Sequence, residues 1–170
     1  GWDLEAERDS MVLTCSNCDT AWEALQAKFA PVDAMKVPGL GEDNLYLPFW
    51  KTSARVKGAG VEINSFSDFI RFTNQPRVVA RERDKEEMSF WSPAFKIRPK
   101  IFLYLTKQMT VVQKDFDLEE VVPKENLPPV TLPKGEAAQS LKITLANAAI
   151  HKKKIFPNLP QVRFAIKNLR

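Results

Sequence analysis

The chain has 170 residues, of which 25 are Lys or Arg and 21 are Asp or Glu, giving a formal net charge of +4. Hydrophobic residues make up 44% of the sequence, with eleven Phe and four Trp, which excludes a disordered protein. No apolar run approaches the ~20 residues that a membrane helix needs. Residues 1–9 are acidic rather than apolar, which excludes a secretory signal there and favours a cytoplasmic protein.

The first predicted element is a β-hairpin over residues 1–18, in which residues 11–14 form the returning strand. This strand delivers Cys15, which together with Cys18 makes up the cysteine content of the chain. Two thiols separated by two residues can bind one metal ion, because the tight turn brings both sulfurs within the ~2.3 Å bonding distance of Zn²⁺. A structural zinc site needs four ligands, and His151 is the single histidine of the sequence.

The order strand, turn, strand and Cys-x-x-Cys resembles the second half of a bacterial zinc ribbon, in which a Cys-Pro-x-Cys-Gly pair precedes the first strand. Gly1 stands where the glycine after that first pair is found, and the resemblance is limited to residues 1–18. It implies that Cys15 and Cys18 are metal ligands and that zinc is the cofactor. The remaining ligands are then expected from a protein partner or from additional segments of the same, longer chain.

Two other interpretations of the cysteine pair stay open. Cys15 and Cys18 can form a thioredoxin-like redox couple, although that motif normally opens a helix within a βαβ unit. They can also be reduced cysteines that pack as small hydrophobic side chains. Attachment of a c-type haem is excluded, because it requires His at the position that Asp19 occupies.

Residues 19–37 complete an expected N-terminal module, 1–37, and fit two structures. Asp19 or Thr20 can cap a short helix that ends near Lys28 and places Trp22 on an apolar face. In a zinc ribbon the same residues form a third strand, and Trp22 covers the cysteine turn. The loop at 38–44, rich in Gly and polar residues, ends the module.

Residues 45–122 are expected to form a β-rich domain that also contains helices. Alternating residues on either side of the turn 58–60 predict a β-hairpin. Ser65, with Asp68 three residues later, predicts a capping box at the start of a short helix. Pro99 is expected to begin a second helix that ends near Met109 and buries a set of apolar side chains: Ile101, Phe102, Leu105 and Met109.

Two Phe-Trp pairs in this domain, at residues 49–50 and 90–91, are expected to meet in one aromatic core. Residues 123–135 contain four prolines and predict an extended linker. The last part, 136–170, is expected to pack on the main domain or continue it, with a helix from Glu136 to about Ile150 and a strand at 162–167. The chain stops in the middle of that strand pattern, so we expect it to be an interior piece of a longer protein.

Basic residues near the C-terminus are not balanced by acids. One interpretation is a contact surface for nucleic acid or an acidic partner, formed by Lys152, Lys153, Lys154, Arg163 and Lys167. The other is a solvated helix end, because lysines that follow a helix complement its dipole.

Motifs of enzymes are missing from the sequence. It has no Gly-rich phosphate loop and no Gly-x-Ser-x-Gly turn, and His151 beside three lysines is a poor general base. The expected fold is therefore α+β, a zinc-ribbon-like hairpin module followed by a β-rich domain with two or three helices. The expected function is a noncatalytic binding or assembly module in which the metal site stabilises a protein interface. Two alternatives stay open, a nucleic-acid-binding zinc ribbon and a thiol redox protein.

Overall fold

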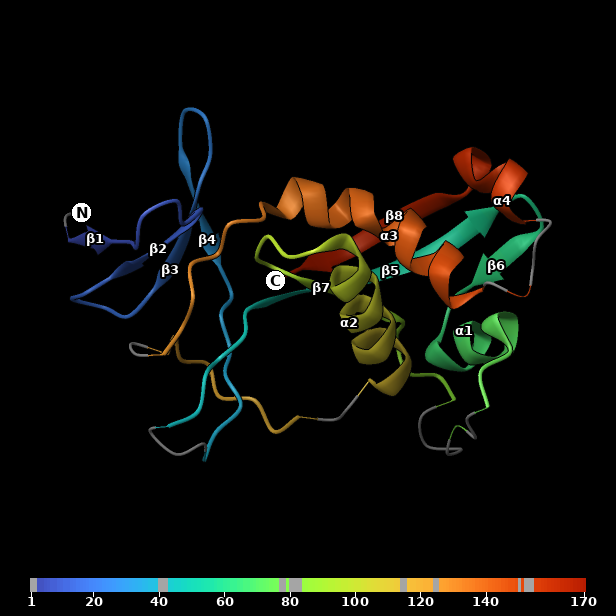
Figure 1. The fold of residues 1–170 in the computed structure, drawn as a ribbon, viewed down its shortest axis with the longest axis horizontal. Coiled ribbons are helices and arrows are strands. Elements are labelled where there is room, and N and C mark those ends of the chain that lie inside the picture. The colour runs from blue at the N-terminus through green and yellow to red at the C-terminus, as the bar shows by residue number, and fades with distance from the viewer. Residues whose placement is uncertain are drawn as a thin grey trace.

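The computed structural model describes residues 3–39, 43–76, 79, 84–113, 116–123, 126–149, 151 and 155–170. Within these ranges the chain forms two antiparallel sheets and three helices of at least eight residues (Figure 1). The predicted α+β fold class is confirmed. None of the described helices is both long and apolar enough to cross a membrane.

The N-terminal sheet contains four strands that are hydrogen-bonded in chain order: β1 (Leu4–Glu5), β2 (Val12–Cys15), β3 (Ala21–Ala24) and β4 (Phe29–Val32). Leu4 lies opposite Cys15, so β1 and β2 form the hairpin that the sequence predicts. Of the two structures predicted for residues 19–37, a short helix or a third strand, the chain forms the strand, β3. Burial alternates along β3 as expected for a strand, because Ala21 and Glu23 are buried and the residue after each is only partly buried.

The second sheet is built around one long strand, with three partners: β5 (Phe49–Gly58) pairs with β6 (Val61–Ile63), β7 (Ser89–Pro93) and β8 (Arg163–Leu169). Val56 lies opposite both Ile63 and Phe164, so β6 and β8 occupy opposite edges of β5. Thr52 lies opposite both Phe90 of β7 and Leu169 of β8, so these two strands also pair with opposite edges of β5. β6 and β7 therefore share one edge of β5, and the hairpin predicted around residues 58–60 is confirmed.

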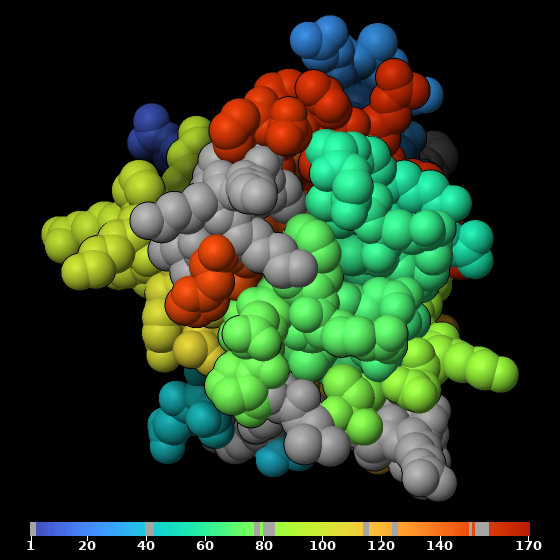
Figure 2. Space-filling view, turned by 90° about the vertical axis from the view of Figure 1, so that its right-hand side faces the viewer, coloured from blue at the N-terminus to red at the C-terminus, as the bar shows by residue number. Residues whose placement is uncertain are grey.

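Gly58 closes this hairpin in a conformation that requires glycine. Its φ is +113°, and a Cβ atom there would lie 2.5 Å from the backbone oxygen of Gln161. Gln161 ends a 3₁₀ turn (Leu159–Gln161) that follows the short helix α4 (Ile155–Asn158). In Figure 2 the β5–β6 hairpin and the residues after α4 lie side by side. The turn thus fixes the C-terminal segment before it enters β8.

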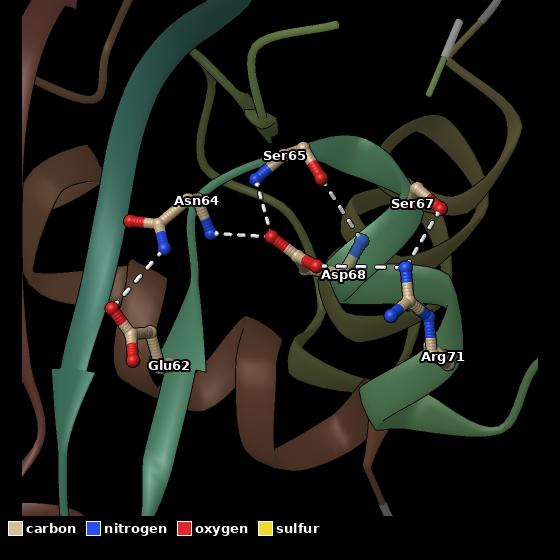
Figure 3. Close-up of polar contacts among 6 residues, drawn as sticks. All are labelled: Glu62, Asn64, Ser65, Ser67, Asp68 and Arg71. Atoms are coloured by element: carbon tan, nitrogen blue, oxygen red, sulfur yellow. Dashed lines mark hydrogen bonds and ion pairs between the residues drawn. The ribbon is translucent and has the colours of Figure 1, made fainter. Parts of the chain in front are cut away.

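Helix α1 (Phe66–Thr73) begins with the predicted capping box, drawn in Figure 3. The Ser65 hydroxyl accepts a hydrogen bond from the Asp68 N–H at 3.2 Å, and the Asp68 carboxylate accepts from the Ser65 N–H at 3.1 Å. The same carboxylate oxygen accepts from the Asn64 N–H at 3.0 Å. These bonds satisfy amide groups that the start of a helix leaves without partners.

Helix α3 (Lys134–Ala148) covers the core face of the second sheet. Leu141 and Leu145 are fully buried and belong to one apolar cluster with Val56 and Phe90. Phe90 makes edge-to-face contacts with Phe69 of α1 and Phe164 of β8, with ring centroids 5.9 Å and 5.5 Å apart. The predicted C-terminal helix is confirmed where it is described, and residue 150 lies outside the described residues.

Helix α2 (Pro99–Val112) begins at the predicted residue but buries a different face. Ile101 is 41% exposed, whereas Thr106 and Thr110 are fully buried. The reason is that α2 lies along the outer edge of β7. The Thr110 hydroxyl accepts from the Trp91 N–H, and the Gln113 side-chain amide donates to the Ser89 carbonyl. A strand edge needs hydrogen-bonding partners, so polar side chains of α2 turn inward.

The prediction of one aromatic core is wrong. Trp50 and Phe90 lie on the covered face of the sheet, but they belong to two separate apolar clusters. Trp91 lies opposite Lys51 and therefore points to the other face. Neighbours in a strand alternate between faces, so a Phe-Trp dipeptide cannot send both rings to the same side.

A segment without helix or strand, residues 126–133, joins the two sheets. Trp50 donates through its indole N–H to the Leu132 carbonyl at 2.7 Å, which attaches the segment to β5. The Met11 N–H donates to the Val130 carbonyl at 2.6 Å, which attaches it to the loop before β2. Val130 is 8% exposed and packs in the cluster that also holds Trp50 and Val12.

Candidate metal centre

Cys15 and Cys18 lie at one end of the N-terminal sheet. Cys15 is the last residue of β2, and the three residues that follow form the turn toward β3. The Asp19 N–H donates to the Cys15 carbonyl at 2.9 Å, and the Cys15 N–H donates to the Thr20 carbonyl at 2.9 Å. Neither cysteine forms a disulfide; Cys15 is partly buried and Cys18 is exposed.

The turn needs one residue in the left-handed conformation, and Asp19 supplies it with φ +54°. Asp tolerates this conformation better than most residues with a side chain. The cysteine turn therefore forms without a glycine after Cys18.

Hydrogen bonds around Cys18 favour its thiolate form. Its sulfur lies 3.1 Å from the Thr20 hydroxyl oxygen, which accepts a hydrogen bond from the Trp22 indole N–H at 2.9 Å. The Thr20 hydroxyl hydrogen can then donate to the sulfur. This bond, followed by the hydrogen bonds with the Cys15 side chain and the Thr20 backbone, lowers the pKa of Cys18 from its ordinary value of 9.0. Trp22 thus orients the Thr20 hydroxyl that is hydrogen-bonded to the Cys18 sulfur.

Strand β1 brings the upstream part of the chain beside the cysteine turn. The Asp3 carbonyl accepts from the Ser16 N–H at 3.0 Å and from the Ser16 hydroxyl at 3.2 Å. Ser16 follows Cys15 directly, so the backbone at Asp3 is a neighbour of the two thiols.

The described residues supply only part of a ligand set. They contain no group of three or more His, Cys, Asp or Glu side chains placed to hold one metal ion. His151, which follows α3 and is exposed, is thus not grouped with the cysteine pair. The pair offers two thiol ligands on a preformed turn, and any zinc bound there requires further ligands from elsewhere.

A cavity of about 510 Å³ opens between the two sheets, and Cys15 is part of its wall. Its lining is mainly apolar and comes from both sheets, including Val12 and Val32 on one side and Phe49 on the other. Sequence reasoning missed this cavity, because it depends on how segment 126–133 holds the sheets together.

Of the predicted basic residues, the structure describes Arg163 and Lys167. Lys152, Lys153 and Lys154 lie outside the described residues. Arg163 and Lys167 both lie on β8, where Arg163 is opposite Lys57 and Lys167 forms an ion pair of 2.5 Å with Glu87. Lys57, which lies opposite Arg163, and Arg55 were not predicted as site residues. Their alternation with buried residues along β5 is the sequence signal that could have identified them.

No protein-family model, curated protein or solved structure matches the chain. The functional conclusion therefore rests on the cysteine turn, the cavity and the basic residues described above.

Proposed function

We propose that the chain is a noncatalytic binding or assembly module in which Cys15 and Cys18 form half of a zinc-ribbon-like site. The observation that carries the proposal is the turn itself, with two reduced thiols at the end of a hairpin and a left-handed residue directly after the second. Zn²⁺ prefers thiolate ligands in tetrahedral sites, and a lowered pKa of Cys18 makes its thiolate available at lower pH.

The missing ligands come from a second segment, either chain that precedes Asp3 or a protein partner. Support comes from the hydrogen bonds of Ser16 to the Asp3 carbonyl, because they hold the backbone of Asp3 beside the turn that carries the two thiols. A zinc ion shared between two segments links them through its coordination bonds. Structural zinc contributes roughly 10–16 kcal/mol of binding free energy in zinc-finger peptides, so such a site stabilises an interface strongly.

A thiol redox function is the second candidate. It is favoured by the same lowered pKa and by the exposure of Cys18, since exposed cysteines with stabilised thiolates are the reactive ones. The turn sits between two strands rather than at the start of a helix, which is not the usual place of a redox Cys-x-x-Cys.

Metal binding and redox activity are distinguished by one set of variants. Cys15→Ser and Cys18→Ser are compared with Ser16→Ala, which keeps both thiols. For the metal site, each Cys variant loses zinc measured by elemental analysis on the natural-length protein, and Ser16→Ala retains it. A redox pair instead gives a reversible intramolecular disulfide by mass spectrometry and no zinc in any of the proteins. Zinc content that does not depend on either cysteine would refute the proposed site.

A further inference from the structure

The second sheet has one face covered by α3 and an opposite face, called here the open face. The open face is exposed around Arg55, Lys57 and Arg163. It is half-buried at Lys51 and Arg170, which line the cavity between the sheets. Along β5, Thr52, Ala54 and Val56 are buried under α3, while Arg55 and Lys57 are exposed. The open face carries six basic side chains and two acidic ones, which we call the basic sheet face: Lys51, Arg55, Lys57, Arg163, Lys167 and Arg170, with Glu62 and Glu87.

The strand register places these residues on one side. Lys57 lies opposite Arg163, and Lys51 exchanges two backbone hydrogen bonds with Arg170, so each pair shares a face. The Lys167–Glu87 ion pair joins the two edges of β5. It must cross over the open face, because the other face is filled by the core.

This arrangement is unfavourable for an isolated sheet. Like charges directly opposite one another destabilise a strand pair, and Lys57 with Arg163 is such a pair. Lys57 is relieved by an ion pair with Glu62 at 3.3 Å. Within the described part of the chain, the structure gives no ion pair to Arg55 or Arg163, both exposed. The excess positive charge of this face favours binding of an anionic partner.

We propose that the basic sheet face binds single-stranded nucleic acid. Residues on one face of a strand recur at ~7 Å, which is comparable with the repeat of an extended sugar–phosphate backbone. The residues between the cations along β5 and β8 are small, Ser53 half-buried and Ala165 and Asn168 exposed, so a backbone can lie close to the sheet. Binding of this kind is electrostatic and weakly dependent on base sequence.

Two other polyanions fit this face less well. The DNA major groove, ~12 Å wide, admits a helix or a two-stranded ribbon, whereas here the two strands that carry the cations, β5 and β8, belong to a wider sheet in which β6 and β7 also pair with β5. A membrane surface is usually bound through apolar side chains that insert beside the cations. Along β5 and β8 the side chains between the cations are too small for that, and Trp91, opposite Lys51 on the same face, is half-buried and packs against Phe116. The proposal also does not involve Cys15 or Cys18, so it is independent of the metal site.

The test measures fluorescence anisotropy of a labelled oligothymidylate of about 15 nucleotides, within the site sizes of single-strand binding folds. The variant is Arg55→Gln with Arg163→Gln, two exposed side chains without core contacts. The control is Lys28→Ala with Lys100→Ala, which removes the same charge from exposed positions on the β3–β4 hairpin and the first turn of α2. Thermal unfolding of each protein verifies the fold.

We expect the Arg variant to bind at least tenfold more weakly at low salt and the control to bind as the parent does. The slope of log K against log salt concentration should fall in magnitude by about 1.4, since each phosphate contact on a single strand contributes about 0.7. Unchanged binding by the Arg variant overturns the proposal, as does no binding by the parent. The proposal is also overturned if binding is lost only when Lys152, Lys153 and Lys154 are replaced by Ala, because the lysine run and not the sheet face would then bind the oligonucleotide. Equal or tighter binding to duplex DNA or to phosphatidylserine vesicles also overturns it.

Discussion

The two sheets of the molecule are stabilised in different ways. The second sheet, with its helices, has an apolar cluster of its own that includes Phe66, Phe69 and Phe90, each at most 1% exposed. The strands of the N-terminal sheet have two to four residues, and Val12 and Val32 pack into a cluster built around Trp50 of the other sheet. The first sheet therefore depends on contacts from outside it. This is the situation in which a metal site adds most to stability.

The largest expected effect is the loss of a core ring from the second sheet. Phe90→Ala removes a fully buried side chain that contacts Phe69 and Phe164, and it should lower the free energy of unfolding by about 3–5 kcal/mol. Urea denaturation measures the change. Phe29→Ala in the N-terminal sheet is the matched control, because Phe29 is 54% exposed. A cost for Phe29→Ala as large as for Phe90→Ala would contradict the contrast between the sheets.

The next effect concerns the turn that closes β5. Gly58→Ala places a Cβ against the Gln161 backbone and forces a left-handed conformation, so unfolding free energy should fall by about 2–4 kcal/mol. Gly60 has φ +74° but nothing within 4 Å of a Cβ, and Gly60→Ala should cost only the conformational part, about 1–2 kcal/mol. Equal melting temperatures for the two variants would show that the Gln161 contact is unimportant.

A smaller effect is expected at the contact between the sheets. Glu23 of β3 is 3% exposed, and its carboxylate accepts from the Lys134 N–H at 2.9 Å, at the start of α3. Pro133, in the capping position, makes no side-chain cap, so Glu23 takes that role from another element. Glu23→Ala should cost about 1–2 kcal/mol in thermal or urea unfolding, because it leaves that amide unsatisfied.

Glu23→Gln serves as the control, since its amide oxygen can still accept the bond. It should cost less than Glu23→Ala, with the difference reflecting the interaction of the negative charge with the helix dipole. If both variants unfold like the parent protein, Glu23 does not connect the sheets energetically.

The smallest effect is on the reactivity of Cys18. Hydrogen bonding lowers the pKa of this thiol when the protein is folded, so alkylation by iodoacetamide should begin at lower pH than for a cysteine near 9.0. This pKa shift also makes the stability of the folded state depend on pH. The folded state gains stability from the thiolate above the unfolded pKa of Cys18, and loses it as the pH falls through the lower, folded value.

Thr20→Val removes the hydroxyl that makes the largest contribution and should raise the pH midpoint of alkylation toward 9.0. Ser16→Ala keeps the Thr20 hydroxyl and should leave the midpoint unchanged. A midpoint in Thr20→Val equal to that of the parent would show that the hydrogen bond does not act on the sulfur.

The features predicted from sequence are those that short-range chemistry determines. The capping box at Ser65, the hairpin at Gly58 and the strand that ends at Cys15 each depend on a few neighbouring residues. The features that were missed depend on residues far apart in the chain. Glu23 is buried because α3 begins beside it, and α2 turns Thr110 inward because β7 needs a partner there. Neither contact has a local sequence pattern.

The candidate site divides in the same way. The Cys15–Cys18 turn could be identified from spacing alone, but the cavity beside Cys15 and the pairing of Arg163 with Lys57 depend on the fold. The spacing of residues in the sequence does not reveal which residues of a neighbouring strand lie opposite a given residue such as Arg163. It also does not reveal which segment would complete the proposed metal site, since the described residues contain no group of three or more potential ligands.

The most direct test of the central claim is zinc stoichiometry, measured by elemental analysis together with intact mass on the natural-length protein. The account predicts about one zinc per chain, as a four-ligand structural site requires. It also predicts that the zinc is lost in the variant with both Cys15→Ser and Cys18→Ser. Absence of zinc from the natural-length protein with its partners present, or zinc retained in the double variant, would contradict it.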